Sequence, residues 1–279
     1  MMRSLLYVPA HSERFVAKAH ERGADAIILD LEDSVPEEAK DRARLGLAEA
    51  VTRVRRGGAT VMVRVNSGER QREDALAARR AGADMLYVPK VRSAEELGAL
   101  SSVLDAAEAV GSRGAMGLVA LIEDPASVLN ASAIARAPRL VGLSLGGEDL
   151  ALALGAEPRP EVLHLPKLLV HYAAKAAGLL SFGLLRSVAD YADLAGLTAA
   201  AREARAHGFD GATCVHPSVV PALNDAFAPN AEELAWAERV LARAADGEGA
   251  FRLDGKMIDA PVIARARAIM SADPSLRRR

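Results

Sequence analysis

Acidic side chains follow several apolar runs of this sequence, at the point where each run ends. Asp30, Glu32 and Asp33 come after one run, Glu123 follows another, and Asp149 lies just beyond a third. Carboxylates from separate segments, with no Cys or His cluster around them, suit a hard cation such as Mg²⁺ or Mn²⁺. The spacing therefore predicts such a site, with Glu123 and Asp149 as the metal ligands.

Each of these carboxylates has a structural alternative as a helix N-cap or as a surface ion-pair partner. The capping alternative suits Asp149 least, because the residue follows Gly146 and Gly147. Paired glycines allow another group to approach the backbone closely, which a simple cap does not require.

Arg64 ends an otherwise apolar run, VMVRVN at residues 61–66. Burying an arginine is costly unless something anionic faces it. A salt bridge to Asp30 or Glu32 would satisfy the charge. A substrate carboxylate or a developing oxyanion would satisfy it equally, and we favour that interpretation.

Three further polar residues lie near the ends of apolar runs. Lys90 has the chemistry of a Schiff-base lysine, but the carboxylates nearby favour an ion-pair role. His216 precedes a proline and could be a ligand, a base or a hydrogen-bonded structural residue; we place it behind the groups that contact substrate. Cys214, the only cysteine, is interpreted as a small buried apolar residue, and no disulfide can form within the chain.

The elements that must position these residues are short apolar runs separated by Ala-rich helical stretches. The runs are continuous rather than alternating, which is typical of strands buried on both faces. They lie at residues 5–8, 26–31, 60–65, 85–88, 117–122, 140–145, 179–185 and 211–215, with helical spacing at 12–22, 36–54, 72–81, 94–109 and 197–207. Eight strands alternating with helices predict a closed (β/α)8 TIM barrel, with an open doubly wound α/β sheet as the alternative.

The pattern changes after Pro229. A charged amphipathic helix at residues 231–245 is followed by a loop at 254–261 and a final helix. We therefore expect a barrel domain at 1–228 and a C-terminal helical extension at 229–279 that acts as a lid.

Composition excludes several classes of protein. The 279 residues are 51% hydrophobic and 26% charged, which is typical of a globular chain rather than a disordered one. The net charge of −2, with both signs interspersed, argues against a nucleic-acid-binding protein. The longest apolar stretches fall far short of the ~20 residues of a membrane helix, and the N-terminus is too short for a secretory signal. We expect a cytoplasmic protein with no membrane partner.

Taken together, these motifs resemble the citrate lyase beta subunit-like CoA ester lyases of the HpcH/HpaI aldolase family, over nearly the full length. The resemblance rests on eight motifs in order: RSLLYVP (3–9), ILDLED (28–33), VRVN (63–66), VPKV (88–91), LIE (121–123), GEDL (147–150), CVHP (214–217) and DGKMIDAP (254–261). It implies a TIM barrel that forms trimers or hexamers and acts on coenzyme A thioesters.

The resemblance also implies roles for single residues. Arg64 matches an arginine that contacts substrate, and Glu123 and Asp149 match the ligands of Mg²⁺. Asp259 matches an acid/base group that reaches the mouth of the neighbouring subunit. Arg14 lies in the part of the chain that is similar to the segment that meets the CoA phosphates.

The same comparison implies that Asp30, Glu32 and Asp33 hold metal-bound water or Arg64. The chain departs from the family pattern in three places. Ala10 replaces the usual glycine after Val-Pro, Ala212 replaces a common lysine, and residues 182–188 (FGLLRSV) replace a different segment. The first bears on the shape of its loop, and the segment at residues 182–188 bears on the substrate pocket or the CoA groove.

The resulting hypothesis is a Mg²⁺-dependent carbon–carbon lyase. It would cleave or form a 3-hydroxyacyl-CoA thioester such as malyl-CoA or citramalyl-CoA, giving acyl-CoA plus a 2-oxo acid. Arg64 and Asp259 would be catalytic, and Arg14, Arg64 and Glu123 would bind substrate. The alternatives are a CoA-independent metal aldolase acting on 4-hydroxy-2-oxo acids, and a citrate-lyase-like subunit active only in a complex.

Overall fold

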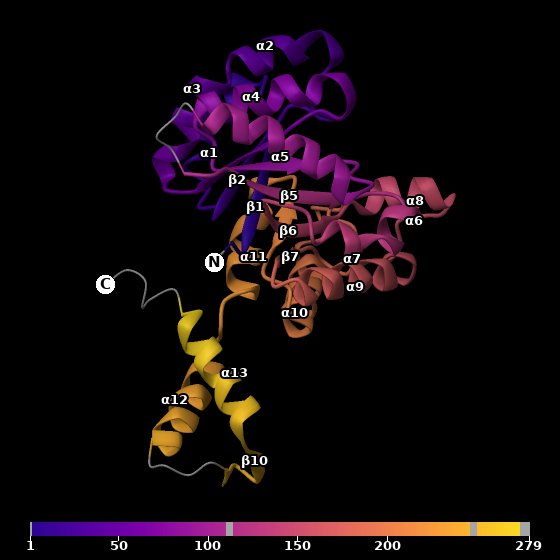
Figure 1. Ribbon diagram of the computed structural model, residues 1–279. Coiled ribbons are helices and arrows are strands. Elements are labelled where there is room, and N and C mark those ends of the chain that lie inside the picture. The colour runs from indigo at the N-terminus through magenta and orange to yellow at the C-terminus, as the bar shows by residue number, and fades with distance from the viewer. Residues whose placement is uncertain (1, 110–113, 246–249, 274–279) are drawn as a thin grey trace. The chain divides into compact units, whose positions relative to one another are not determined.

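The computed structural model describes residues 2–109, 114–245 and 250–273 (Figure 1). The chain divides into two compact units, Met2–Asn224 and Asp225–Arg279. The sequence had placed this boundary between residues 228 and 229. We describe each unit by itself.

The first unit is built on parallel strands. Its described part has eight: β1 (Ser4–Pro9), β2 (Ala26–Asp30), β3 (Thr60–Arg64), β4 (Met85–Val88), β5 (Gly117–Ile122), β6 (Leu140–Leu145), β7 (Leu180–Phe182) and β8 (Ala212–Cys214). They pair in the order β7-β6-β5-β4-β3-β2-β1-β8. A parallel bridge between Phe182 and Gly211 brings β7 beside the start of β8. This closure confirms the predicted (β/α)8 barrel and excludes the open doubly wound sheet.

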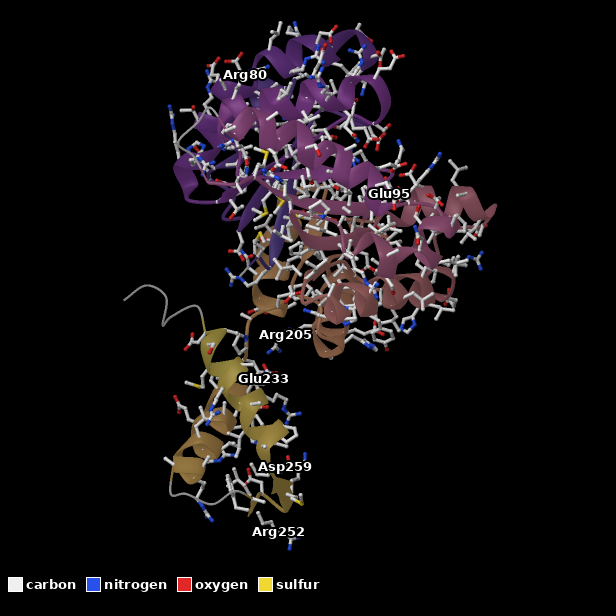
Figure 2. All side chains as sticks on the ribbon, in the orientation of Figure 1. Arg80, Glu95, Arg205, Glu233, Arg252 and Asp259 are labelled. Carbon is white, nitrogen blue, oxygen red and sulfur yellow. The ribbon has the colours of Figure 1, made fainter. Side chains whose placement is uncertain are left out.

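Helices surround the strands in Figure 1. They are α1 (Glu13–Ala19), α2 (Lys40–Leu45), α3 (Leu47–Val54), α4 (Gln71–Ala81), α5 (Ala94–Glu108), α6 (Pro125–Leu129), α7 (Ala131–Ile134), α8 (Gly147–Leu154), α9 (Pro160–Ala176), α10 (Leu194–His207) and α11 (Val220–Ala226). Charged side chains such as Arg80 and Glu95 are exposed on the outer helices (Figure 2). None of the described helices is both long and apolar enough to cross a lipid bilayer.

Apolar side chains from the strands fill the barrel interior. The buried cluster consists of Leu5, Ala26, Ile28, Met62, Tyr87, Val119, Leu121 and Phe182. Residues from alternate positions along the strands make such layers in closed barrels. The packed interior leaves the carboxyl ends of the strands as the place where polar groups gather.

The second unit packs two helices against a hairpin. Its elements are α12 (Ala231–Ala245), β9 (Phe251–Leu253), β10 (Lys256–Ile258) and α13 (Ala260–Ser271). Asp254 and Gly255 both have positive φ, 51° and 77°, as a two-residue hairpin turn of type I′ requires. The sequence predicts a loop here, and the structure corrects this to a hairpin. A small apolar core of its own contains Ala237, Val240 and Phe251.

Candidate active site

Strand register places Arg64 among carboxylates at the mouth of the barrel. Asp30, the last residue of β2, lies directly opposite Arg64, the last residue of β3. Nε and Nη2 of Arg64 each donate a hydrogen bond to Asp30, both at 2.7 Å. Its Nη1 lies 3.0 Å from Oε2 of Glu32 and 3.0 Å from Oδ2 of Asp33. Cζ also lies 4.9 Å from the centre of the Tyr7 ring.

The electrostatics of this group fix Arg64 and Asp30 as an ion pair. Burial works against ionisation of Asp30, but the hydrogen bonds and charge of Arg64 outweigh it and lower the pKa of the carboxyl. Burial likewise opposes the charge of Arg64, yet Asp30 raises the pKa of the guanidinium. Burial dominates at Glu32 and raises the pKa of that carboxyl, against the effects of Arg64 and Lys90.

The structure shows the ion pairs of the salt-bridge alternative for Arg64, and the substrate-binding interpretation stays a prediction. The guanidinium is satisfied by Asp30, Glu32 and Asp33 without any substrate. The Arg64 side chain nonetheless lines a cavity at the mouth of the barrel. Nη2 has two N–H groups, and the described residues supply an acceptor for only one of them. A substrate oxygen could accept from the other.

Glu123 and Gly146 lie side by side because β5 and β6 are in register up to their last residues, Ile122 and Leu145. The N–H of Gly146 donates to the carbonyl of Ile122 at 2.9 Å. A Cβ at Gly146 would lie 2.8 Å from Cγ and 2.9 Å from Oε1 of Glu123. Only glycine leaves room for the Glu123 carboxylate here, which explains one of the paired glycines.

Glu123 is 4% exposed and shares the mouth with Asp149 in the first turn of α8. Burial raises the pKa of Glu123 to about 8; Lys90 N–H opposes the rise, and the charges of Glu32 and Asp149 add to it. In the described residues, no Lys or Arg side chain forms an ion pair with either Glu123 or Asp149. Two carboxylates that share a cavity, one of them buried, and that have no ion-pair partner among the described residues fit a divalent cation with oxygen ligands.

Lys90 connects the two groups of carboxylates. Its main-chain N–H donates to Oε2 of Glu123 at 2.6 Å, and its Nζ donates to Oε1 of Glu32 at 2.8 Å. Lys90 has φ of 54°, in the left-handed region that is uncommon for residues other than glycine. The contact between Nζ and Glu32 agrees with the ion-pair interpretation of Lys90. The main-chain N–H has an additional role, because it orients the Glu123 carboxylate.

Arg64, Glu123 and Asp149 line a cavity of about 330 Å³ at the carboxyl ends of the strands. Its charged lining consists of Asp30, Asp33, Arg64, Glu123, Glu148, Asp149 and Lys167. The barrel thus brings together the carboxylates and the arginine that the sequence singled out in the first unit.

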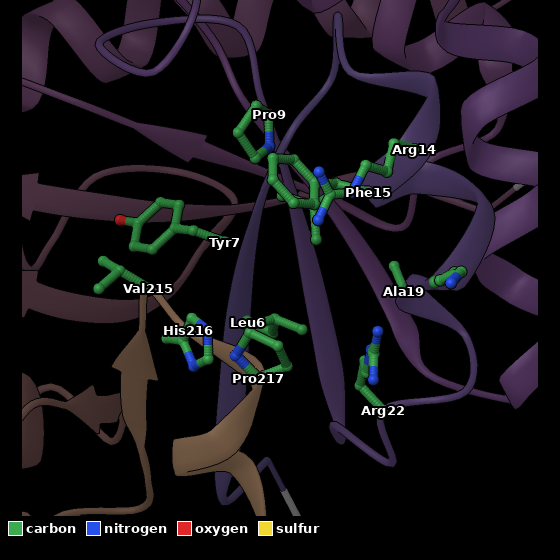
Figure 3. Close-up of a pocket in the computed structure, with 12 residues that line it drawn as sticks. Leu6, Tyr7, Pro9, Arg14, Phe15, Ala19, Arg22, Val215, His216 and Pro217 are labelled. Atoms are coloured by element: carbon green, nitrogen blue, oxygen red, sulfur yellow. The ribbon is translucent and has the colours of Figure 1, made fainter. Parts of the chain in front are cut away.

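A second cavity of about 320 Å³ is basic (Figure 3). Arg14 and Lys18 are four residues apart on α1, so they share one face of the helix, and Arg22 follows its end. Figure 3 shows Arg14 and Arg22 on one side of the cavity and His216 on the other. No carboxylate is among its described lining residues. The two cavities share Tyr7, Pro9 and Val215 in their walls.

His216 therefore lies in the wall of the basic cavity and not among the lining residues of the carboxylate cavity. Its Nδ1 is 2.7 Å from Oγ of Ser218, and its ring stacks on Tyr191 with centres 4.8 Å apart. Cys214 is buried, and burial raises the pKa of its thiol to about 12, as expected for a residue with a packing role.

Lys167 of α9 is a cavity residue that was not predicted from the sequence. It is 5% exposed and lines the carboxylate cavity. No carboxylate of the described residues lies within ion-pair distance of it. The signal was present in the sequence, because Leu163, Lys167, Val170 and Ala174 follow helical spacing on the buried face of α9.

A second group with metal-ligand chemistry was also missed. His164 of α9 and Glu203 and His207 of α10 hold one ligand atom each within 4.8 Å of one another. Glu203 and His207 are exposed. None of the three is among the residues that line the two cavities described above. The carboxylate pair at the barrel mouth remains the site that fits Mg²⁺.

Asp259 belongs to the second unit, where it precedes α13 (Figure 2). Its side chain makes no capping hydrogen bond to that helix. Its role in a neighbouring subunit stays a prediction.

Known proteins resemble this chain in sequence and in fold. The profile of the HpcH/HpaI aldolase/citrate lyase family matches residues 3–217. The chain is 35% identical to citrate lyase subunit beta of Escherichia coli K12, across 96% of this chain and 92% of that one. It is 34% identical to a (3S)-malyl-CoA thioesterase of Cereibacter sphaeroides, across 96% and 93%.

A solved structure is similar as well. The crystal structure of CitE from Mycobacterium tuberculosis in complex with magnesium, acetoacetate and coenzyme A superposes with a TM-score of 0.80 at 32% identity, covering 96% of this chain and 97% of that one. These findings confirm the family resemblance and the barrel fold drawn from the motifs.

Proposed function

Because this chain belongs to the HpcH/HpaI aldolase/citrate lyase family, whose members are lyases, we propose that it cleaves a 3-hydroxyacyl-CoA thioester. Malyl-CoA and citramalyl-CoA are the substrates that fit, and the products are acyl-CoA and a 2-oxo acid. The observation that carries the proposal is that a basic cavity and a carboxylate cavity share Tyr7, Pro9 and Val215 as walls. A CoA thioester has a polyanionic end and a reactive end, and the two cavities match them.

The reactive end belongs at Glu123 and Asp149, which would hold Mg²⁺. The related CitE structure contains magnesium and an oxo acid, which supports this assignment. Bound there, the ion supplies Lewis-acid polarisation of a substrate oxygen. Lys90 N–H and the space left by Gly146 keep the Glu123 carboxylate in one orientation for this task.

Arg64 would stabilise the negative charge that develops on the thioester oxygen as the carbon–carbon bond breaks. The ion pair with Asp30 holds the guanidinium in place before substrate arrives, and the remaining Nη2 N–H is the donor. A donor that is already oriented stabilises the transition state without reorganisation at the moment of reaction.

The polyanionic end belongs at Arg14, Lys18 and Arg22. In the described part of the chain, none of the three forms an ion pair, so their charges are free to meet phosphates. Arginine and lysine bind phosphate groups by charge-assisted hydrogen bonds. The related CitE structure contains coenzyme A, in support of a CoA-binding surface in this family.

Asp259 would move the proton, acting in the mouth of a neighbouring subunit of a homotrimer or hexamer. Support comes from the DGKMIDAP motif and from a carboxylate that does not cap its own helix. In the cleavage direction, a base removes the proton of the substrate hydroxyl, the C–C bond breaks to give the 2-oxo acid, and the thioester enolate takes up a proton.

Thioester hydrolysis is a second candidate, favoured by the 34% identity to a malyl-CoA thioesterase. It would act on the same substrate but release CoA and the free hydroxy acid. The 35% identity to a citrate lyase subunit likewise keeps activity within a complex as an alternative.

The proposal is tested by incubating the purified chain with hydroxyacyl-CoA thioesters and, separately, with the corresponding free acids. Cleavage of the thioesters but not of the free acids supports the proposal. Cleavage of 4-hydroxy-2-oxo acids without CoA would show a free-acid aldolase instead, and free CoA as the main product would show a thioesterase.

A further inference from the structure

Lys167 is a buried cation in the wall of the carboxylate cavity. Its side chain is 5% exposed, and its Cε lies 3.8 Å from the position that a Cβ would take on Gly147, beside the first turn of α8. Pro166 precedes it and interrupts the hydrogen-bond ladder of α9. The residue therefore lies next to the α8 turn that carries Asp149.

No described residue neutralises this ammonium group. No hydrogen bond or ion pair joins Lys167 to any described carboxylate, although the mouth contains several. The charge of Glu148 is the one that favours the protonated form, and Glu148 is exposed and already accepts a hydrogen bond from Ser187. Burying an ammonium without a partner is strongly unfavourable.

The other charges in and around the cavity are already assigned. Asp30, Glu32 and Asp33 form ion pairs with Arg64, and Glu123 and Asp149 form the proposed cation site. Once a divalent cation balances the last two, Lys167 is the cation of the cavity that still lacks an anion. The anion that enters with the proposed substrate is the carboxylate of its 2-oxo acid half.

Resting on the proposed function, we infer that Lys167 binds the carboxylate group of the 2-oxo acid half of the substrate. It thereby acts as a substrate-binding residue that selects for an acid at this end of the molecule. A thioester without that carboxylate would leave the ammonium unpaired in the cavity and would be bound less well.

The test measures binding of pyruvate in the presence of Mg²⁺ by isothermal titration calorimetry on the full chain. Lys167→Met should weaken pyruvate binding about 10- to 100-fold, the range for a hydrogen bond to a charged group. Lys167→Arg should retain most of the affinity. Binding of Mg²⁺ alone and of acetyl-CoA, which has no free carboxylate on its acyl group, should change less than threefold.

Two matched variants separate this role from a structural one. Lys175→Met removes a lysine from the same helix, where Lys175 forms an exposed ion pair with Asp210 at 2.6 Å, and should bind pyruvate as the unmodified protein does. Glu148→Gln should also leave pyruvate binding intact. If Glu148→Gln reproduces the loss seen in Lys167→Met, the lysine is a structural partner of Glu148 and the inference is wrong.

The inference and the proposed function can fail separately. Wild-type affinity for pyruvate in a folded Lys167→Met variant overturns the inference, even when thioesters are cleaved. Lysine-dependent pyruvate binding in a protein that cleaves no thioester supports the carboxylate site while overturning the lyase proposal. Absence of pyruvate binding in the unmodified protein with Mg²⁺ overturns the inference as well.

Discussion

The main-chain nitrogen of Lys90 lies 2.6 Å from Oε2 of Glu123. The ammonium group of the same residue lies 2.8 Å from Oε1 of Glu32. One residue therefore joins the carboxylates around Arg64 to the carboxylate proposed for the metal. Its left-handed backbone, with φ of 54°, costs about 1–2 kcal/mol in a residue other than glycine, so the surrounding structure must hold it there.

Gly146 leaves the space that Glu123 occupies, so adding a methyl group should disturb the metal site. Gly146→Ala would place Cβ 2.8 Å from Cγ of Glu123 and force the side chain aside. We expect Mg²⁺ affinity to fall about 10- to 100-fold, as when other groups that orient metal ligands are changed. Calorimetric titration with Mg²⁺ measures this.

The control for this change is Gly98→Ala in α5, where an added Cβ meets nothing within 4 Å. It should bind Mg²⁺ normally and gain roughly 0.5–1 kcal/mol of stability. Unaltered Mg²⁺ affinity in Gly146→Ala would show that Glu123 is not a metal ligand.

Arg64 has a structural and a catalytic role that two variants can separate. Arg64→Met leaves Asp30 buried without its partner and should cost about 3–5 kcal/mol of stability. Adding Asp30→Asn should restore much of that loss, because the uncompensated charge is gone. The rate of thioester cleavage should nonetheless stay roughly 10²–10³-fold low in the double variant.

Urea unfolding and steady-state kinetics measure the two effects. Arg70→Ala, which removes a half-buried surface arginine paired with Glu37 and Asp41, serves as the control and should leave the rate unchanged. A stable double variant with the wild-type rate would limit Arg64 to a structural role.

Lys167 should make stability depend on pH in the alkaline range. Burial lowers the pKa of this lysine from 10.5 to about 8, opposed by the charge of Glu148. Between those pH values the unfolded chain binds more protons than the folded one, so the free energy of unfolding rises with pH across this window. The shift corresponds to about 3 kcal/mol of destabilisation at neutral pH in the absence of a bound anion.

We therefore expect Lys167→Met to be more stable than the unmodified chain at pH 7, with the difference shrinking toward pH 10.5. Urea midpoints between pH 7 and pH 11 measure it, with Lys175→Met as the exposed comparison. A variant that is less stable at pH 7 would show that the lysine already has a counter-ion.

Asp259 and Arg64 should complement each other between subunits. Alone, Asp259→Asn and the Arg64→Met/Asp30→Asn double variant should each be nearly inactive. In the proposed oligomer, co-expression in equal amounts should give mixed assemblies in which about a quarter of the mouths combine an intact Arg64 with an intact Asp259 from the neighbour. Activity of the mixture near that fraction supports the shared site, whereas activity equal to that of the separate variants contradicts it.

The barrel was predictable because strands buried on both faces are continuous apolar runs, and their ends locate the polar mouth. β7 is shorter than its apolar run because Gly183, with φ of 155°, turns the chain. The N–H of Gly183 donates a hydrogen bond to the carbonyl of Gly211. The hairpin at residues 251–258 had a sequence signal, the Asp254-Gly255 pair. The apolar residues beside that pair were interpreted as a loop.

A site residue could be predicted from the sequence where it lies at the end of a strand. Asp30 and Arg64 follow from strand ends alone, and register then makes them partners. The lysine of α9 lies on a helix rather than at a strand end, so a search of strand ends passes over Lys167. The donation from Lys90 N–H to Glu123 depends on a backbone angle, which no side-chain pattern encodes.

The central claim is tested most directly by incubating the purified full chain with malyl-CoA and citramalyl-CoA and identifying the products by mass spectrometry, with Mg²⁺ and with excess EDTA. The account predicts acetyl-CoA with glyoxylate from the first thioester, or acetyl-CoA with pyruvate from the second. Both products should disappear with EDTA and return when Mg²⁺ is restored. Intact thioesters in the presence of Mg²⁺, or cleavage that EDTA leaves unchanged, would contradict it.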